Sequence, residues 1–292
     1  MVGRIIPIAP LPNSVMFSRG AEAAARTGNC SPRYVCPLCL VSYFTPDDKS
    51  LSREHVPAES LGGKPLLLTC KSCNREAGGK LQGHQVQRER QEAFWRGDGS
   101  GKLNFEHHAQ GGTVRGEIET SGPVRRFSVQ PSRTSPQALE SWLSAGQEAG
   151  SFSLERNFNW QASRIADLRD AYLWTFAHFG YAMVALPAYD WVRRAIQEVA
   201  SSNTKWAINL DDEFSSEQQQ AFGGPVFLVT HIPECALVVA NGSRGIILPT
   251  PFCPDPYSTL ESSQASLSFL PQSIRVPSEM KLVWDFLPLE AP

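Results

Sequence analysis

Apolar and polar positions recur with two different periods along the chain, and the change of period divides it into segments. Between residues 34 and 70, short apolar runs are separated by Pro, Asp and Ser, and three leucines precede Cys70. This pattern is typical of hairpin strands. Residues 80–95 carry sparse apolar positions on a charged background, which predicts an exposed helix. The first third of the chain therefore reads as a hairpin followed by a helix.

The rest of the chain predicts a larger mixed body. Residues 102–129 alternate in the manner of strands, and residues 135–149 predict a helix. The strongest helical signal spans residues 163–185, where apolar residues recur every three or four positions, and a second helix is expected over 187–200. Further strand-like runs lie at residues 206–210, 226–231, 236–239, 245–248 and 282–286.

The glycine-rich segment at residues 97–101 predicts a linker between these parts. We therefore expect an N-terminal lead-in at residues 1–30, a small module at 31–96 and a larger body at 102–292. The predicted fold class is α+β, with the small module followed by a mixed α/β body.

Composition and charge narrow the class of protein. Of 292 residues, 41% are hydrophobic and 19% charged, which is enough apolar material for a core and too little charge for general disorder. A net charge of −2 excludes a uniformly basic protein that coats nucleic acid, so any such contact must be local. No apolar run is long enough to span a bilayer, and prolines interrupt the N-terminal apolar stretch where a secretion signal would lie.

Four of the seven cysteines form two pairs with metal-ligand spacing, Cys36-Pro-Leu-Cys39 and Cys70-Lys-Ser-Cys73. Each pair can present two sulfurs to one tetrahedral Zn²⁺ ion. The segment is too short to bury much apolar surface, so the ion would supply folding free energy of about 10 kcal/mol or more. The odd count and the pairing favour a reducing, cytoplasmic setting. A closed zinc site without catalysis is the alternative interpretation of the cysteines alone.

The residues between and after the pairs suggest chemistry. Glu54-His55-Val56-Pro57 and a Gly62-Gly63 pair lie between them, and Asn74 directly follows Cys73. Phosphodiester hydrolysis needs a base and an oxygen-ligated cation. Carboxylate and amide oxygens from Glu54 and Asn74 suit Mg²⁺ or Mn²⁺, and the imidazole of His55 suits the base.

This combination resembles the HNH, or ββα-metal, endonucleases built on a treble-clef zinc scaffold, over Cys36 to about His84. The resemblance implies a structural zinc on the four cysteines. It also implies Glu54 as a ligand of the catalytic ion, where the family often has Asp, His55 as general base, and Asn74 as second ligand or orienting residue. Glu in place of Asp lengthens the arm to the metal.

His84 is a further candidate ligand of the catalytic ion, because family motifs often end in a His or Asn ligand. On a continuous helix, the ten residues from Asn74 rise about 15 Å and turn about 80° away from its face. His84 can therefore share the ion only if the helix breaks at Gly78-Gly79; a phosphate contact or a plain surface histidine is the alternative.

Lys71, Arg75 and Lys80 add positive charge beside this site and are expected to contact nucleic-acid phosphates. The alternative is a solvated helix face with Glu76 interspersed.

We therefore expect a metal-dependent HNH endonuclease, a hydrolase that acts on nucleic acid, with DNA favoured over RNA. Analogy suggests a role in restriction or phage defence. Residues 102–292 show no catalytic motif and are expected to select substrate, bind a regulatory partner or form a homo-oligomer. The alternative is an inactive, zinc-stabilised module that binds nucleic acid or protein.

Overall fold

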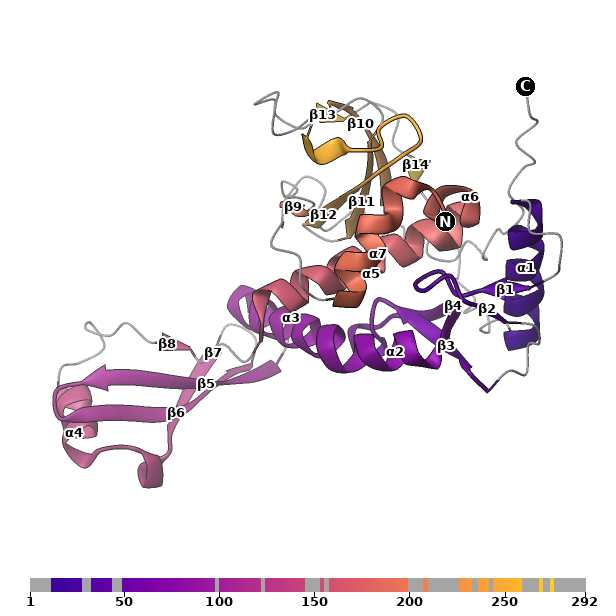
Figure 1. Cartoon of the computed structure of the whole chain (residues 1–292). Helices are drawn as coiled ribbons and strands as arrows, with labels where there is room; N and C mark the ends of the chain where they lie inside the picture. Colours follow the sequence, from indigo (N-terminus) through magenta and orange to yellow (C-terminus); the bar gives the residue numbers. More distant parts are fainter. Residues whose placement is uncertain are drawn as a thin grey trace, which may run out of the picture. The chain divides into compact units, whose positions relative to one another are not determined.

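The computed structural model describes residues 12–27, 33–43, 49–97, 100–121, 124–144, 153–154, 158–198, 207–209, 226–232, 236–241, 244–258, 268–269 and 274–275. These residues form a mixed α+β protein with small antiparallel sheets (Figure 1). The chain divides into two compact units, one of Met1–Gln82 with Gln161–Pro292 and one of Gly83–Trp160. This division differs from the expected boundary at residues 97–101, because the chain leaves the first unit at Gln82 and returns to it at Gln161.

The first unit begins with a helix and two antiparallel hairpins. Its elements are, in chain order, α1 (Asn13–Arg26), β1 (Tyr34–Val35), β2 (Ser42–Tyr43), β3 (Leu51–Val56), the 3₁₀ turn η1 (Glu59–Leu61), β4 (Lys64–Cys70), α2 (Lys71–Ala77) and the π-helical η2 (Gly78–Gln82). Strand β1 pairs with β2, and β3 pairs with β4. The hairpin predicted over residues 34–70 is therefore present.

Helix α1 lies in the segment that was expected to be a lead-in. Its apolar face, including Met16 and Phe17, is buried against Tyr34 and against Leu68 of the β3–β4 hairpin. The rings of Phe17 and Tyr34 stack with centroids 5.7 Å apart. Part of the N-terminal segment thus contributes to the core, because the small hairpin offers an apolar face that needs a cover.

The C-terminal half of the first unit consists of helices and a second sheet. Its elements are α5 (Trp160–Phe179), α6 (Tyr181–Val184), η4 (Pro187–Tyr189), α7 (Asp190–Glu198), β9 (Ala207–Asn209), β10 (Val226–Ile232), β11 (Leu237–Asn241), β12 (Arg244–Leu248), β13 (Ser268–Phe269) and β14 (Ile274–Arg275). The strand order is β13-β10-β11-β12-β9, and β14 also pairs with β10. The strand expected at 282–286 lies outside the described residues.

The helix predicted over residues 163–185 is interrupted. Helix α5 ends at Phe179, and Gly180 adopts a positive φ of 63° before α6 begins. A positive φ is readily available to glycine, so this residue permits the chain to turn between the two helices. The break leaves α5 as a long buried helix, with fourteen of its side chains inside the unit.

Helices α5 to α7 lie between the C-terminal sheet on one side and the β3–β4 hairpin with α2 on the other (Figure 1). One apolar core joins all three layers. Polar side chains of the helices also hold the end of β1 and the loop after it. The Tyr172 hydroxyl donates to the Pro37 carbonyl at 2.5 Å, the Tyr181 hydroxyl donates to the Val35 carbonyl, and Gln197 Nε2 donates to the Leu38 carbonyl at 2.7 Å.

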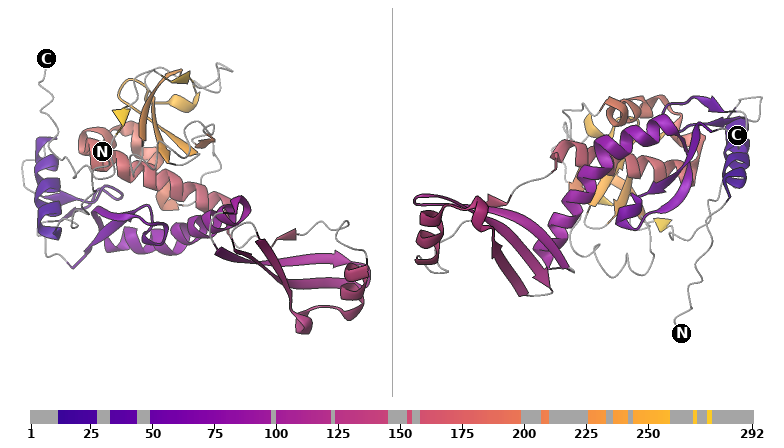
Figure 2. Two further views of the ribbon diagram at one scale, coloured as in Figure 1. Left: turned by 180° about the vertical axis from the view of Figure 1, so that it is seen from behind. Right: turned by 90° about the horizontal axis from the view of Figure 1, so that it is seen from below.

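The second unit contains one helix followed by a four-stranded antiparallel sheet and its cover. Its elements are α3 (Gly83–Arg96), β5 (Ser100–Ala109), β6 (Gly112–Ser121), β7 (Val124–Val129), η3 (Pro131–Arg133), α4 (Pro136–Ser144) and β8 (Ser153–Leu154). The strand order is β7-β6-β5-β8, and α4 packs against β5 and β6 (Figure 2). Phe94, Phe105, Val114, Ile118 and Ala138 form its core.

Within the described part of the chain, no helix is both long enough and apolar enough to cross a bilayer. The longest helix, α5, carries Arg164, Asp167, Arg169 and Asp170 among its apolar residues.

Replacing Tyr181 with phenylalanine should loosen the end of β1, where the cysteine loop begins. The change leaves the buried Val35 carbonyl without its donor, so we expect the free energy of unfolding to fall by about 1–3 kcal/mol. If the loop holds a zinc ion, a chelator should also remove the ion faster. Chemical denaturation and a colorimetric zinc-release assay measure the two effects.

The matched control is Tyr257→Phe. The hydroxyl of Tyr257 is also buried, but it donates to the Ile247 carbonyl in the C-terminal sheet at 2.5 Å. This variant should lose stability without releasing zinc faster. Equal rates of zinc release in the two variants would contradict the direct role of Tyr181.

Candidate functional site

The two predicted cysteine pairs meet at one point of the first unit. Cys36 directly follows β1 and Cys39 lies in the same loop, whereas Cys70 ends β4 and Cys73 lies in the first turn of α2. The four Sγ atoms all lie within 4.8 Å of one another. Among the described residues, this is the one group of three or more His, Cys, Asp or Glu side chains close enough to hold a metal. The cluster can bind a structural metal such as zinc.

Backbone hydrogen bonds shape both halves of the cluster. The Cys36 amide donates to the Val41 carbonyl at 2.9 Å, and the Leu40 amide donates back to the Cys36 carbonyl at 2.8 Å, which closes the first loop. At the second pair, Cys70 caps α2, because its sulfur accepts from the Cys73 amide at 3.4 Å. The helix start and the cysteine pair are thus one local structure.

The electrostatics of the cluster fit a divalent cation. The hydrogen bond from Cys36 lowers the pKa of Cys39 to about 2 and that of Cys70 to about 6. The pKa of Cys36 itself is raised, first by its hydrogen bond to Cys39 and further by burial. Thiols this close cannot all ionise without a cation, whereas a bound Zn²⁺ accepts all four as thiolates.

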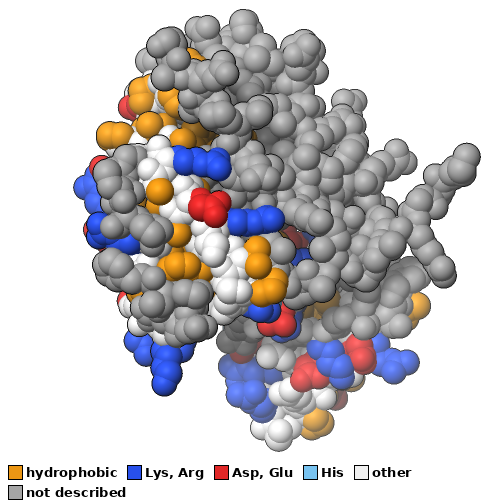
Figure 3. Space-filling view, turned by 90° about the vertical axis from the view of Figure 1, so that its right-hand side faces the viewer, with side chains coloured by type: hydrophobic (Ala, Val, Ile, Leu, Met, Phe, Trp, Pro, Cys, Tyr) orange, Lys and Arg blue, Asp and Glu red, His pale blue; other side chains and the backbone are white. Residues whose placement is uncertain are grey.

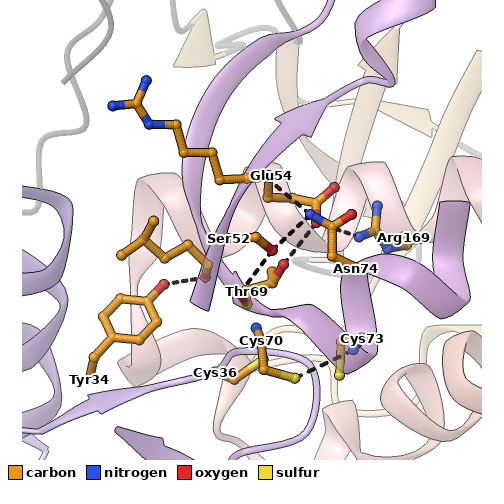
Figure 4. Close-up of polar contacts among 11 residues, drawn as sticks. Tyr34, Cys36, Ser52, Glu54, Thr69, Cys70, Cys73, Asn74 and Arg169 are labelled. Atoms are coloured by element: carbon orange, nitrogen blue, oxygen red, sulfur yellow. Dashed lines mark hydrogen bonds and ion pairs between the residues drawn. The ribbon is translucent and has the colours of Figure 1, made fainter. Parts of the chain in front are cut away.

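Glu54 lies in the middle of β3 with its side chain turned into the protein, where it is 1% exposed. Its Oε2 accepts a hydrogen bond from the Thr69 hydroxyl at 2.9 Å and lies 2.7 Å from Nη2 of Arg169 (Figure 4). Thr69 belongs to the partner strand β4, and Arg169 reaches the carboxylate from α5. Three elements therefore converge on Glu54.

Asn74, on α2, faces the same strand. Its Nδ2 donates to the Ser52 hydroxyl at 3.1 Å and to the Arg53 carbonyl at 3.0 Å (Figure 4). The Ser52 hydroxyl in turn donates to the Thr69 carbonyl at 3.4 Å. One polar network thus links Asn74 to Glu54. Because the amide nitrogen is used, the amide oxygen is the end that can ligate a metal.

His55 follows Glu54 on β3 and is half-buried. The pairing of β3 with β4 shifts register between Glu54 and His55, so that His55 lies opposite Pro65. It makes no hydrogen bond or ion pair with another residue that the structure describes. The imidazole therefore lies next to the network in the chain without being part of it.

His84 belongs to the second unit, in the first turn of α3. Its Nδ1 accepts a hydrogen bond from the Asn159 amide at 3.1 Å. The helix that starts at Lys71 does change at the glycine pair, where it becomes π-helical over Gly78–Gln82. The structure thus joins Glu54 with Asn74 in one network, and places His84 in the other unit.

The three predicted phosphate contacts separate into two environments. Lys71 and Arg75 are exposed and line a surface pocket of about 420 Å³ with Asn74. Lys80 instead lines a pocket of about 400 Å³ beside the cysteine cluster, and its Nζ lies 3.4 Å from Glu76. The nearby carboxylate offsets its charge, so positive charge concentrates at Lys71 and Arg75.

Basic side chains are not gathered on the face that Figure 3 shows. There, Lys and Arg are interspersed with acidic and hydrophobic side chains in the described part of the surface. This distribution agrees with the near-neutral net charge.

Sequence reasoning missed Arg169 and Thr69. Arg169 lies far along the chain from Glu54, in the helix whose periodicity marked it as core, and it is fully buried. Its charge among apolar neighbours was a usable signal, because a buried arginine needs a partner.

No family model, curated protein or solved structure matches this chain. The chemistry of the site therefore rests on these residues alone.

Purified protein should contain one zinc ion per chain. Cys39→Ser or Cys73→Ser should remove this ion. Because the ion contributes folding free energy, each change should also lower the midpoint of thermal unfolding by more than about 5 °C. Elemental analysis and thermal unfolding measure both effects. Cys253→Ser is the matched control, since Cys253 is buried outside the cluster. Zinc that stays bound in the Cys39 and Cys73 variants would show that the cluster is not the metal site.

The Gly62-Gly63 pair has a structural reason that can be tested. Gly62 has a φ of 82°, and a Cβ on Gly63 would lie 1.6 Å from the Pro57 carbonyl oxygen. Gly63→Ala should therefore force the β3–β4 connection apart and cost about 3 kcal/mol or more of stability. Gly79→Ala is the control, because a Cβ there meets no atom within 4 Å. Equal denaturation midpoints for the two variants would contradict this close approach.

Proposed function

We propose that this chain is a metal-dependent endonuclease of the HNH type, which hydrolyses phosphodiester bonds of nucleic acid. The observation that carries the proposal is the network that links Glu54 and Asn74 on the strand–strand–helix unit β3–β4–α2. This unit also contributes Cys70 and Cys73 to the four-cysteine cluster. The order of β3, β4 and α2 supports a ββα-metal unit on a treble-clef scaffold.

Each part of the unit has a distinct role in this proposal. Zinc on the four cysteines would hold the loop after β1 against the start of α2. A Mg²⁺ or Mn²⁺ ion, held by the Glu54 carboxylate and the Asn74 amide oxygen, supplies Lewis acidity at the phosphate when it is bound. These are hard oxygen donors, and the exposed pocket beside Asn74 gives phosphate access.

The remaining residues handle the proton and the substrate. The imidazole of His55 takes a proton from the attacking water, since histidine is the side chain that most often acts as a general base. Lys71 and Arg75 hold substrate phosphates at the pocket that also contains Asn74. Lys80 contributes less, since Glu76 offsets its charge. DNA is the favoured substrate, and a role in restriction or phage defence stays a prediction.

One observation favours the alternative, an inactive zinc-stabilised module that binds nucleic acid or protein. The Glu54 carboxylate is buried and already has two partners, as a structural carboxylate would. Metal-dependent cleavage distinguishes the two functions.

The test is cleavage of supercoiled plasmid and single-stranded oligonucleotides by the full chain with Mg²⁺, Mn²⁺ or EDTA. His55→Ala should lower the rate at least about 100-fold, the usual contribution of a general base, while zinc content and stability stay unchanged. His108→Ala is the matched control, because His108 is exposed on β5 of the second unit. Cleavage by His55→Ala at the wild-type rate would remove His55 as the base. No cleavage by wild type with any ion would favour the binding module.

A further inference from the structure

We propose that Arg169 and Thr69 position the Glu54 carboxylate as a ligand of the catalytic ion, so that helix α5 completes the candidate active site. This inference rests on the proposed function. It assigns a role to the C-terminal half of the first unit, in which the sequence shows no catalytic motif.

The first argument is which oxygen is held. The Thr69 hydroxyl and the Arg169 guanidinium both contact Oε2 of Glu54, from β4 and from α5 (Figure 4). Two contacts at one oxygen fix the orientation of the carboxylate without using Oε1. Carboxylates that ligate metals are commonly oriented by such outer partners.

The second argument is that Arg169 does not block the carboxylate. A bidentate pair would place guanidinium nitrogens on both oxygens and leave neither for a cation. Here one nitrogen, Nη2, lies at one oxygen. The contact therefore orients Glu54 and still leaves Oε1 to bind the ion.

The third argument is that packing alone does not account for an arginine at this position. Arg169 is 0% exposed, and its neighbours in α5, Leu168 and Tyr172, are as fully buried. Among the described residues, none of its three side-chain nitrogens has a hydrogen-bond partner, so the Glu54 ion pair is the contact that this charge makes. Apolar residues in place of a buried ion pair are often neutral or stabilising. A site that needs an oriented carboxylate explains the arginine better than stability does.

The experiment measures binding of Mn²⁺ to the zinc-loaded full chain without nucleic acid, by electron paramagnetic resonance and calorimetry. Mn²⁺ prefers oxygen ligands, so the zinc-filled cysteines do not compete for it. Arg169→Met and Thr69→Val should each raise the Kd for Mn²⁺ about 10–100-fold, the usual effect of removing an outer partner. Arg169→Lys should restore part of the affinity, since a single contact does not need the guanidinium fork.

Two controls separate positioning from folding. Thr69→Ser keeps the hydroxyl and should bind Mn²⁺ as wild type does. Arg193→Met removes another buried arginine, which contacts Asp190 and the Val184 carbonyl, and should lose stability without losing Mn²⁺ affinity. Zinc content and thermal unfolding are measured on every variant. If Arg169→Met does not fold, the Thr69→Val and Thr69→Ser pair decides.

The outcomes distinguish the inference from the proposed function. If Mn²⁺ binds wild type and Asn74→Ala weakens it, but Arg169→Met and Thr69→Val bind as tightly as wild type or tighter, the positioning role is overturned and the proposed function stands. If wild type binds no Mn²⁺, or Asn74→Ala leaves binding unchanged, the proposed function fails and the inference fails with it. Weaker binding in both variants, with the controls unaffected, supports the inference.

Discussion

The first unit is organised around four cysteine sulfur atoms that lie within 4.8 Å of one another. They join the loop after β1 to the place where β4 ends and α2 begins, because Cys70 is both a member of the cluster and the cap of that helix. The direction in which α2 leaves the hairpin, and hence the position of Asn74 against β3, follows from this point. Thiolates this close repel one another, so a cation on the cluster and the fold around it are expected to form together.

The helices of the C-terminal half pack around the cysteine cluster and make further contacts with the elements that carry it. Tyr181 on α6 donates to the Val35 carbonyl at the end of β1. Tyr172 on α5 donates to the Pro37 carbonyl in the cysteine loop, and Arg169 on the same helix reaches Glu54. One element therefore supports both the candidate zinc site and the candidate catalytic carboxylate. A fragment limited to residues 31–96 would lose these contacts and expose the apolar core shared with α5. The hairpins with the cysteine cluster and the helices α5 to α7 therefore belong to one compact unit.

Neither unit shows an extended patch of one charge among its described residues. In the first, positive charge is concentrated at Lys71 and Arg75 beside Asn74, whereas Lys80 pairs with Glu76. In the second, the exposed face of the sheet carries opposite charges that pair across strands, as in Arg115 with Glu106. Paired surface charges give little attraction for a polyanion, so a phosphate contact of the kind proposed would cover a small area.

The sequence by itself determined the features that depend on neighbours in the chain. The spacing of two cysteine pairs specifies a metal cluster, and the periodicities specify most helices and strands, since both patterns arise within a few residues. Glu54 and Asn74 were identified as candidates from the residues between and directly after the cysteine pairs, and the structure joins them in one network. The roles of Glu54, Asn74 and His55 in catalysis stay predictions.

Only the tertiary structure decided which distant segments meet. In the structure, residues 83–160 form a separate unit, α1 packs against the hairpin, and Arg169 lies beside Glu54. A buried ion pair between a strand and a helix produces no recognisable pattern in the sequence. Its two residues meet only because the strand and the helix pack against each other in the fold. The residue types that could form the site were therefore identifiable from the sequence, whereas the pairing of Arg169 with Glu54 could be identified only from the fold.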